Sequence, residues 1–271
     1  MLTRSCSGRL HGARAAIFFA SCLLSGPAFA QGAGAGPNVT APAILNPLTD
    51  ATQLLVTPTV AFPDASGSDP QSSVNFQPGV PFPVSSDWLV VTRTEVAILY
   101  TPGAERPMAL GDADTSFFLV PARTGIWIWG VGPIVQLPSA TDVSSGTGKW
   151  SVGPTGALVY VNGPWTNGVI VSHLLSFAGA HSREEVSLTQ IETQISYSFP
   201  NSWYVSSAPT LECNWRLSPG QRWIVPLGLE VGRQFSVRSH NLSVQVGAYY
   251  NVRRPTGEAT WTLSTQFGWV Q

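Results

Sequence analysis

The chain has 271 residues, of which 11% are charged and 10% are aromatic, with ten tryptophans. An ordinary soluble domain has about 25% charged residues, so this chain has little surface suited to water. Its formal net charge of −1 provides no basic field for nucleic acid, which we exclude as a partner.

The first thirty residues have the order of a secretory signal peptide. Three arginines precede an apolar run at 15–24, and Ala28-Phe29-Ala30 provides a small-residue cleavage signal. The run is too short for a membrane helix, which needs roughly 20 apolar residues. We therefore predict a signal peptide over residues 1–30 and export through the inner membrane. The mature chain keeps one cysteine, Cys213, so it cannot form an internal disulfide.

The mature chain is predicted to have two parts. Residues 31–50 are small and rich in proline, and indicate a flexible lead-in. Residues 51–271 lack the roughly 18 consecutive apolar residues of a membrane helix. A chain that enters a bilayer without helices must close into a barrel, because open sheet edges leave backbone groups unpaired in lipid.

About twelve strand segments follow, separated by clusters of Gly, Pro, Asn, Asp and Ser, as in an all-β chain. The predicted strands are 52–62, 72–84, 87–100, 115–122, 126–137, 149–161, 165–178, 187–199, 203–214, 221–234, 241–252 and 259–270.

Alternation is clearest in the C-terminal half. Over residues 222–234, Trp223, Val225 and Leu227 belong to one parity, while the other is small or polar. The polar parity is mostly Ser, Thr, Gln, Gly and Asn, whereas a soluble sheet usually has Lys, Glu and Arg facing water. Trp and Tyr gather near segment ends, as the aromatic girdles of outer-membrane barrels require.

Long and short links alternate along the chain until the last two links, where the predicted lengths become equal. Bacterial barrels alternate long outside loops with short periplasmic turns. The fold class predicted is therefore all-β: a transmembrane antiparallel up-and-down barrel of about twelve strands, with both termini in the periplasm.

Four short motifs in order resemble one bacterial family. They read GDADTSFF at 111–118, IWGVGP at 128–133, LPSATD at 137–142 and GKWSVGP at 148–154. Together they are similar to the outer-membrane proteins of Gram-negative bacteria grouped with the phenol-degradation meta-pathway porins, often mislabelled neuromedin U. The resemblance runs from about residue 46 to the C-terminus. It implies a transmembrane barrel that transports hydrophobic or aromatic compounds.

Polar residues of the inward parity are candidates for lining the lumen. They are Arg93, Glu95, Gln190, Glu192, Gln194, Glu212, Asn214, Arg216, Arg222, Glu230 and Gln234. We expect Glu192, Glu212, Arg216, Arg222 and Glu230 to form a ladder of ion pairs across the wall. Such a ladder either constricts and selects permeants or fills the lumen and holds the barrel together.

Other chemistry has weaker support. Asp112, Asp114 and Asp142 carry the oxygen ligands that suit Ca²⁺, but turn and strand-start roles explain them as well. Ser172-His173 is adjacent in sequence, so the two side chains point to opposite faces of a strand and cannot act as nucleophile and base. The sequence has no nucleophile elbow or phosphate loop. We predict no enzyme activity, no metal and no cofactor.

The function predicted is an outer-membrane channel or transporter for passive uptake of small solutes whose identity the sequence does not give. Its expected partners are outer-membrane lipid and the barrel-assembly machinery. The first alternative is a plugged structural or surface-interaction barrel without conductance. A further alternative is a soluble periplasmic β-sandwich that binds a ligand.

Overall fold

The computed structural model describes residues 45–63, 69–102, 107–237 and 240–271. The predicted signal peptide, and the lead-in as far as residue 44, lie outside these residues. The strands are β1 (Gln53–Phe62), β2 (Gln71–Pro83), β3 (Trp88–Tyr100), β4 (Met108–Leu110), β5 (Ala113–Pro121), β6 (Trp127–Leu137), β7 (Lys149–Asn162), β8 (Trp165–Gly179), β9 (Ser187–Ser198), β10 (Trp203–Ser207), β11 (Thr210–Asn214), β12 (Trp223–Val237), β13 (His240–Arg253) and β14 (Trp261–Val270).

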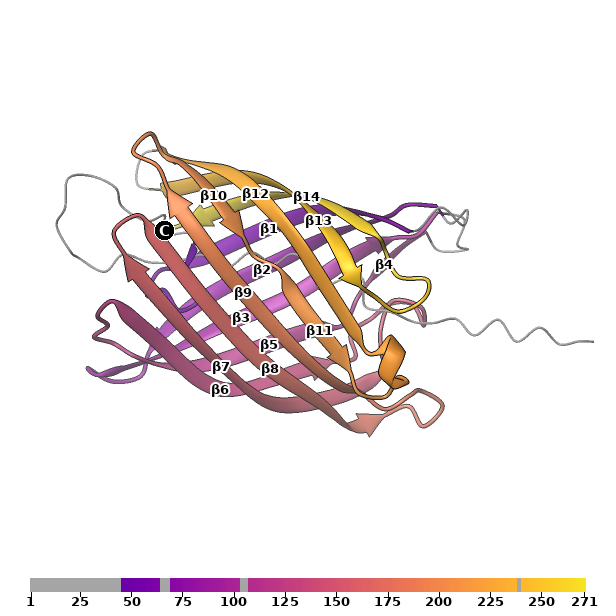
Figure 1. Ribbon diagram of the computed structural model, residues 1–271. Helices are drawn as coiled ribbons and strands as arrows, with labels where there is room; N and C mark the ends of the chain where they lie inside the picture. Colours follow the sequence, from indigo (N-terminus) through magenta and orange to yellow (C-terminus); the bar gives the residue numbers. More distant parts are fainter. Residues whose placement is uncertain (1–44, 64–68, 103–106, 238–239) are drawn as a thin grey trace, which may run out of the picture.

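These segments form one closed antiparallel barrel (Figure 1). β4 and β5 both pair with β3, and β10 and β11 both lie between β9 and β12, so each pair is one interrupted barrel strand. Twelve barrel strands result, as the sequence predicts. β1 pairs with β14 from Gln53↔Val270 to Phe62↔Trp261, which closes the sheet. The soluble sandwich alternative is therefore wrong, since a sandwich keeps two separate sheets.

The links define two ends of the barrel. At one end, here called the short-link end, β2, β5, β7, β9 and β12 end and β3, β6, β8, β10 and β13 begin, beside the start of β1 and the end of β14. At the other, the long-link end, β1, β3, β6, β8, β11 and β13 end and β2, β4, β7, β9, β12 and β14 begin. The predicted loss of alternation at the last two links is wrong, because β12 continues to Val237 and β13 begins at His240.

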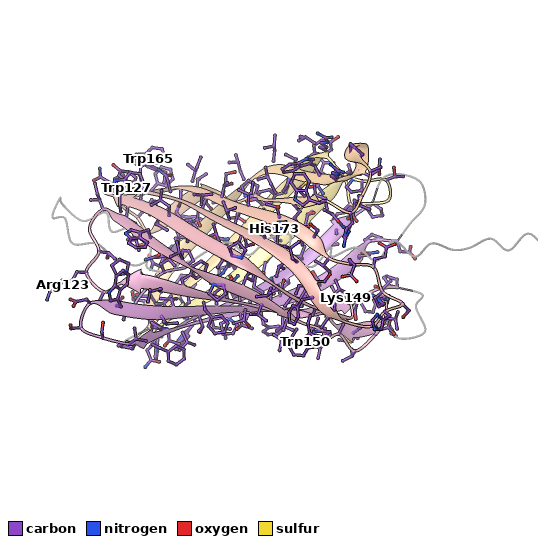
Figure 2. The ribbon with its side chains drawn as sticks, turned by 90° about the horizontal axis from the view of Figure 1, so that it is seen from below. Arg123, Trp127, Lys149, Trp150, Trp165 and His173 are labelled. Atoms are coloured by element: carbon purple, nitrogen blue, oxygen red, sulfur yellow. The ribbon has the colours of Figure 1, made fainter. Side chains whose placement is uncertain are left out.

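The outer face is apolar and has an aromatic girdle near each end. Trp127 and Trp165 lie at the short-link end and Trp150 near the other (Figure 2). Outward rings pair across neighbouring strands: Trp127 with Tyr160 at 4.8 Å between centroids, and Tyr250 with Trp261 at 4.9 Å. An apolar outer band flanked by aromatic girdles is the outer surface of a membrane barrel.

Within the described residues, no helix has the length and apolar character needed to cross a membrane.

Candidate permeation path and its closures

The middle of the barrel is crossed by an ion pair between nearly opposite walls. Arg93 on β3 donates from Nη1 and Nη2 to the two carboxylate oxygens of Glu192 on β9, at 2.8 and 2.6 Å. Its Nη2 also lies 2.7 Å from Oε1 of Glu95 on the same strand. Arg93 is 4% exposed. A bidentate pair of this geometry is among the stronger hydrogen-bonded contacts, so it bridges the lumen firmly.

Carboxyl groups outnumber cations around this bridge. Besides Glu95 and Glu192, the inward parity carries Asp114 on β5, Glu212 on β11 and Glu230 on β12, all within the part of the chain that the structure describes. Neutral groups hydrogen-bond to them. Gln190 donates to Glu212 at 3.2 Å, and Ser206 and Gln245 each donate to Glu230 at 3.1 Å.

A small cavity lies beside the bridge. It measures about 20 Å³ and is lined by Arg93, Glu95, Asp114, Gln190 and Glu192, together with residues of β5 to β8, among them Ile134 and Ile170. That volume holds about one water molecule. The Arg93–Glu192 bridge thus forms a first closure, between β3 and β9.

A second closure lies toward the short-link end, where an apolar collar lines the inside of the wall. Its members come mainly from β1 and β3 to β8: Leu55, Val91, Phe118, Val120, Ile128, Ala157, Val159, Val161 and Ile170. Leu45 and Leu48, just before β1, pack into this collar and are 2% and 3% exposed. Asn46 fixes the turn between them by accepting a hydrogen bond from the Leu48 N–H at 2.8 Å. The end of the predicted lead-in therefore lies inside the barrel.

The long-link end is tied together by a different set of contacts. Lys149 Nζ donates to Glu185 Oε1 at 2.7 Å, and Arg183 donates to the carbonyls of Gly146 and Thr147. The hydrogen bond from Lys149 holds the pKa of the Glu185 carboxyl below its usual range. In the β13–β14 link, burial raises the pKa of the Glu258 carboxyl from 4.5 to about 7.

The structure brings most of the candidate lumen residues together. Arg93, Glu95, Gln190, Glu192, Gln194, Glu212 and Glu230 lie on the inward parity of their strands, within or beside the central layer. Asn214 and Gln234 lie nearer the ends of β11 and β12.

The ion pairs of the described residues differ from the expected ladder. Arg216 and Arg222 lie in the β11–β12 link, where Arg222 Nε donates to the Leu217 carbonyl and its guanidinium lies 5.6 Å from the Trp215 ring centroid. The strand ends at Asn214, so the inward parity does not continue to Arg216. The guanidinium that reaches Glu192 comes instead from Arg93, 99 residues away in sequence.

Several residues of the closures were missed by the sequence reasoning. The collar residues were not identified, although stretches such as 117–120 and 157–161 are apolar on both parities, which indicates strand halves with apolar inner faces. Tyr204 was also missed. It is 1% exposed, and its hydroxyl donates to Gln245 at 2.9 Å inside the barrel.

The aspartates considered for Ca²⁺ have local roles. Asp112 accepts hydrogen bonds from the Thr147 backbone N–H and hydroxyl at 2.6 and 2.7 Å, and Asp142 caps its own turn through Ser144. Among the described residues, no group of three or more His, Cys, Asp or Glu side chains could hold a metal ion.

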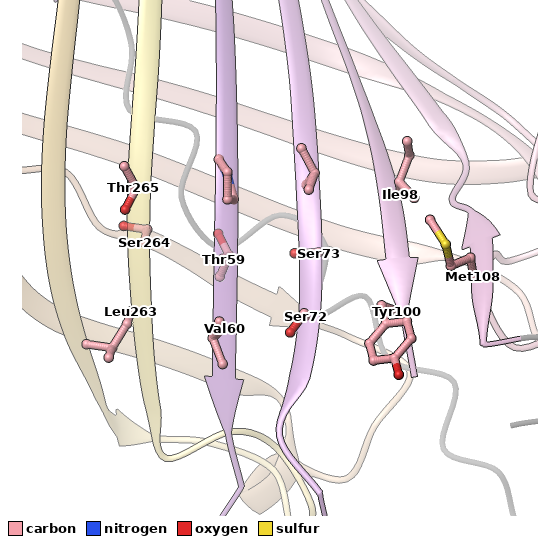
Figure 3. A pocket seen from close by; sticks show the side chains of 12 residues that line it. Thr59, Val60, Ser72, Ser73, Ile98, Tyr100, Met108, Leu263, Ser264 and Thr265 are labelled. Atoms are coloured by element: carbon pink, nitrogen blue, oxygen red, sulfur yellow. The ribbon is translucent and has the colours of Figure 1, made fainter. Parts of the chain in front are cut away.

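A larger hollow, of about 330 Å³, lies outside the lumen (Figure 3). It is lined by outward side chains of β1 to β4 and β14, among them Val60, Ile98, Tyr100, Met108 and Leu263. These belong to the apolar outer parity, so the hollow faces the surroundings of the barrel and is separate from the path between its ends.

No family model and no curated protein matches this sequence. Solved structures do match. An outer membrane channel from Pseudomonas putida F1 aligns over 89% of this chain and 100% of its own, with 11% identity and a TM-score of 0.59. The fold is that of an outer-membrane β-barrel. The NanC porin aligns over 79% of this chain and 98% of its own, with 10% identity and a TM-score of 0.50.

Outer membrane phospholipase A from Escherichia coli also aligns, over 82% of this chain and 92% of its own, with 13% identity. Its TM-score of 0.45 is too low to support an argument about activity. At these identities the likenesses concern the fold. The predicted outer-membrane barrel is thus confirmed, and the phenol-degradation family remains a prediction.

Proposed function

We propose that this chain is a passive outer-membrane channel for small solutes, without enzyme activity. In this proposal, residues 1–30 direct export, the barrel-assembly machinery inserts residues 51–271 into the outer membrane, and the long-link end faces outside.

The observation that carries the proposal is how the lumen is closed. Polar inward side chains line the central layer, and the bridge across it consists of the side chains of Arg93 and Glu192. Side chains can change rotamer without disturbing the sheet, and charged groups at a constriction select permeants in channels. A closure of this kind can open while the barrel stays intact.

The apolar collar supports hydrophobic or aromatic permeants, the class that the family resemblance implies. A solute moving from the central layer toward the short-link end would meet Phe118, Val159 and Ile170 on one wall. It would have to displace Leu45 and Leu48, whose side chains now occupy that surface. An apolar solute would replace the burial that these leucines lose.

The second candidate is a plugged structural or surface-interaction barrel without conductance. Two obstructions favour it, since the Arg93–Glu192 bridge crosses the lumen and Leu45 and Leu48 pack into the collar.

Single-channel conductance in planar bilayers separates the two. We would compare the mature protein with Arg93→Ala/Glu192→Ala, which removes both partners of the bridge and so avoids leaving either charge unpaired, and with Leu45→Ser/Leu48→Ser. If the protein is a channel, the variant that combines all four substitutions will show conductance steps several-fold larger than the wild-type protein, because the two closures lie in series and both must be removed.

Leu54→Ser is the matched control, since Leu54, the second residue of β1, is a leucine near the same end of the barrel that faces outward, 36% exposed. It should leave the steps unchanged. Heat-dependent migration on SDS gels would show that every variant is folded. Folded variants that stay silent would reject the channel and favour the plugged barrel.

A further inference from the structure

Arginine side chains gather at one place on the rim of the long-link end. Arg216 and Arg222 lie in the β11–β12 link, and Arg253 ends β13. The two segments are tied together, because Arg253 donates to the Pro219 carbonyl at 3.3 Å and the Thr256 N–H donates to Gln221 at 2.6 Å. This rim therefore presents several guanidinium groups on a fixed framework.

A row of polar groups continues from this rim onto the outer face. Trp215, beneath the Arg222 guanidinium, donates from Nε1 to the Thr189 hydroxyl at 2.8 Å. The same hydroxyl lies 2.8 Å from Nδ1 of His173 on β8. Thr189 is the cross-strand partner of both His173 and Cys213, and Cys213 pairs with Trp223. The row therefore runs from the rim down the outer face to His173, which lies nearer the middle of the wall (Figure 2).

The position of His173 is unusual for this face. It belongs to the outward parity of β8, between Val171 and Leu175, which are 45% and 48% exposed (Figure 2). Ionisable side chains that face a membrane are costly in hydrocarbon and usually mark a functional contact. An imidazole at this position can hydrogen-bond to the ester or amide groups that join the headgroup of a lipid to its acyl chains.

We propose that Arg216, Arg222, Trp215 and His173 form a binding site for a phosphorylated lipid of the outer leaflet. The planar guanidinium matches the oxygens of a phosphate, and Arg is the preferred residue for such contacts. In this site the lipid phosphate contacts Arg216 and Arg222. The ester or amide linkage between the headgroup and the acyl chains contacts His173, and the acyl chains lie on Val171 and Leu175. A free phosphate ion would gain nothing from the last two contacts, which is why we commit to a lipid.

One acidic group lies within electrostatic reach of this site. On the adjoining β8–β9 link, Glu185 is bound to Lys149 and also interacts with Arg216, and Glu184 is exposed to solvent. In the β13–β14 link, Glu258 is buried. The proposal rests on the outer-membrane location given above, but it does not depend on conductance.

The test measures binding of lipid A, and of the same lipid after removal of its phosphates, to the mature protein in detergent. The variant Arg216→Ala/Arg222→Ala removes the two guanidinium groups. Arg123→Ala/Arg233→Ala is its control at the short-link end, where Arg233 lies over Trp203 at the same 5.6 Å.

We expect the wild-type protein and the control to prefer the phosphorylated lipid by about tenfold, the order of a charge-assisted contact. The Arg216→Ala/Arg222→Ala variant should lose that preference. His173→Leu should weaken binding of both lipids equally, since it contacts the linkage. Equal binding of both lipids to the wild-type protein, or equal losses in the control, would overturn the site.

Competition separates the lipid from a free anion. Inorganic phosphate at millimolar concentration should leave lipid binding unchanged, whereas displacement of the lipid would assign the site to a free anion and overturn the proposal. Lipid binding measured on the variant that lacks both closures, Leu45→Ser/Leu48→Ser/Arg93→Ala/Glu192→Ala, keeps the two proposals apart. If it is silent but still prefers phosphorylated lipid, the channel alone is rejected, and if it conducts without that preference, the lipid site alone is rejected.

Discussion

Two glycine–proline pairs in neighbouring strands show how single residues shape the barrel wall. A Cβ on Gly132 would lie 1.8 Å from the carbonyl oxygen of Phe117, and one on Gly153 would lie 1.6 Å from that of His173. The prolines that follow them, Pro133 and Pro154, are cross-strand partners and donate no backbone hydrogen bond. Gly-Pro dipeptides end two of the motifs that carry the family resemblance. The close approach of neighbouring backbones explains why glycine stands there.

We predict that Gly153→Ala destabilises the barrel. The clash is with backbone, so β7 and β8 must separate locally, and overpacking of this kind costs about 1–3 kcal/mol or more. The midpoint of heat-dependent migration on SDS gels should fall by several degrees. Gly220→Ala is the control, because no atom lies within 4 Å of its added Cβ. An unchanged midpoint for Gly153→Ala would contradict the close approach.

At the scale of elements, the strands could be predicted where their two faces differ chemically. In β12 and β14 most outward residues are apolar and most inward residues are polar or small, so the period of two is visible in the sequence. The half of β7 nearer the short-link end is apolar on both faces, because its inward residues belong to the collar. Alternation is lost there, and the collar could not be predicted. The Arg93–Glu192 bridge joins distant strands, which local patterns do not reveal.

The β13–β14 link should respond to pH through Glu258. Its carboxyl is 6% exposed, and burial raises its pKa from 4.5 to about 7. A raised pKa in the folded state means that the stabilising contribution is fully present below pH 4.5 and is lost as the pH rises through about 7. The shift corresponds to at most about 3 kcal/mol.

We therefore predict that the wild-type melting midpoint falls more between pH 4.5 and pH 8.5 than that of Glu258→Gln. The neutral amide cannot ionise, so it should remove this part of the pH dependence and leave the rest. Parallel pH profiles for the two proteins would show that Glu258 is not protonated by burial in the folded state.

For the molecule as a whole, the charge inside the lumen determines which ions pass once the closures open. Five inward carboxyl groups, from Glu95, Asp114, Glu192, Glu212 and Glu230, surround the Arg93 guanidinium in the described central layer. A low-dielectric wall focuses this field along the axis, which concentrates cations and repels anions.

We predict that the channel prefers potassium over chloride, which the reversal potential in a KCl gradient measures. Glu212→Gln/Glu230→Gln keeps the volume of both side chains and replaces two ionisable carboxyl groups with neutral amides, so at alkaline pH, where carboxyl groups are charged, the ratio of potassium to chloride permeability should move toward one. Asp87→Asn, an exposed carboxyl in the β2–β3 link, should leave the ratio unchanged. Chloride preference in the wild-type protein would mean that Arg93, rather than the surrounding carboxyl groups, sets the field that a permeating ion meets.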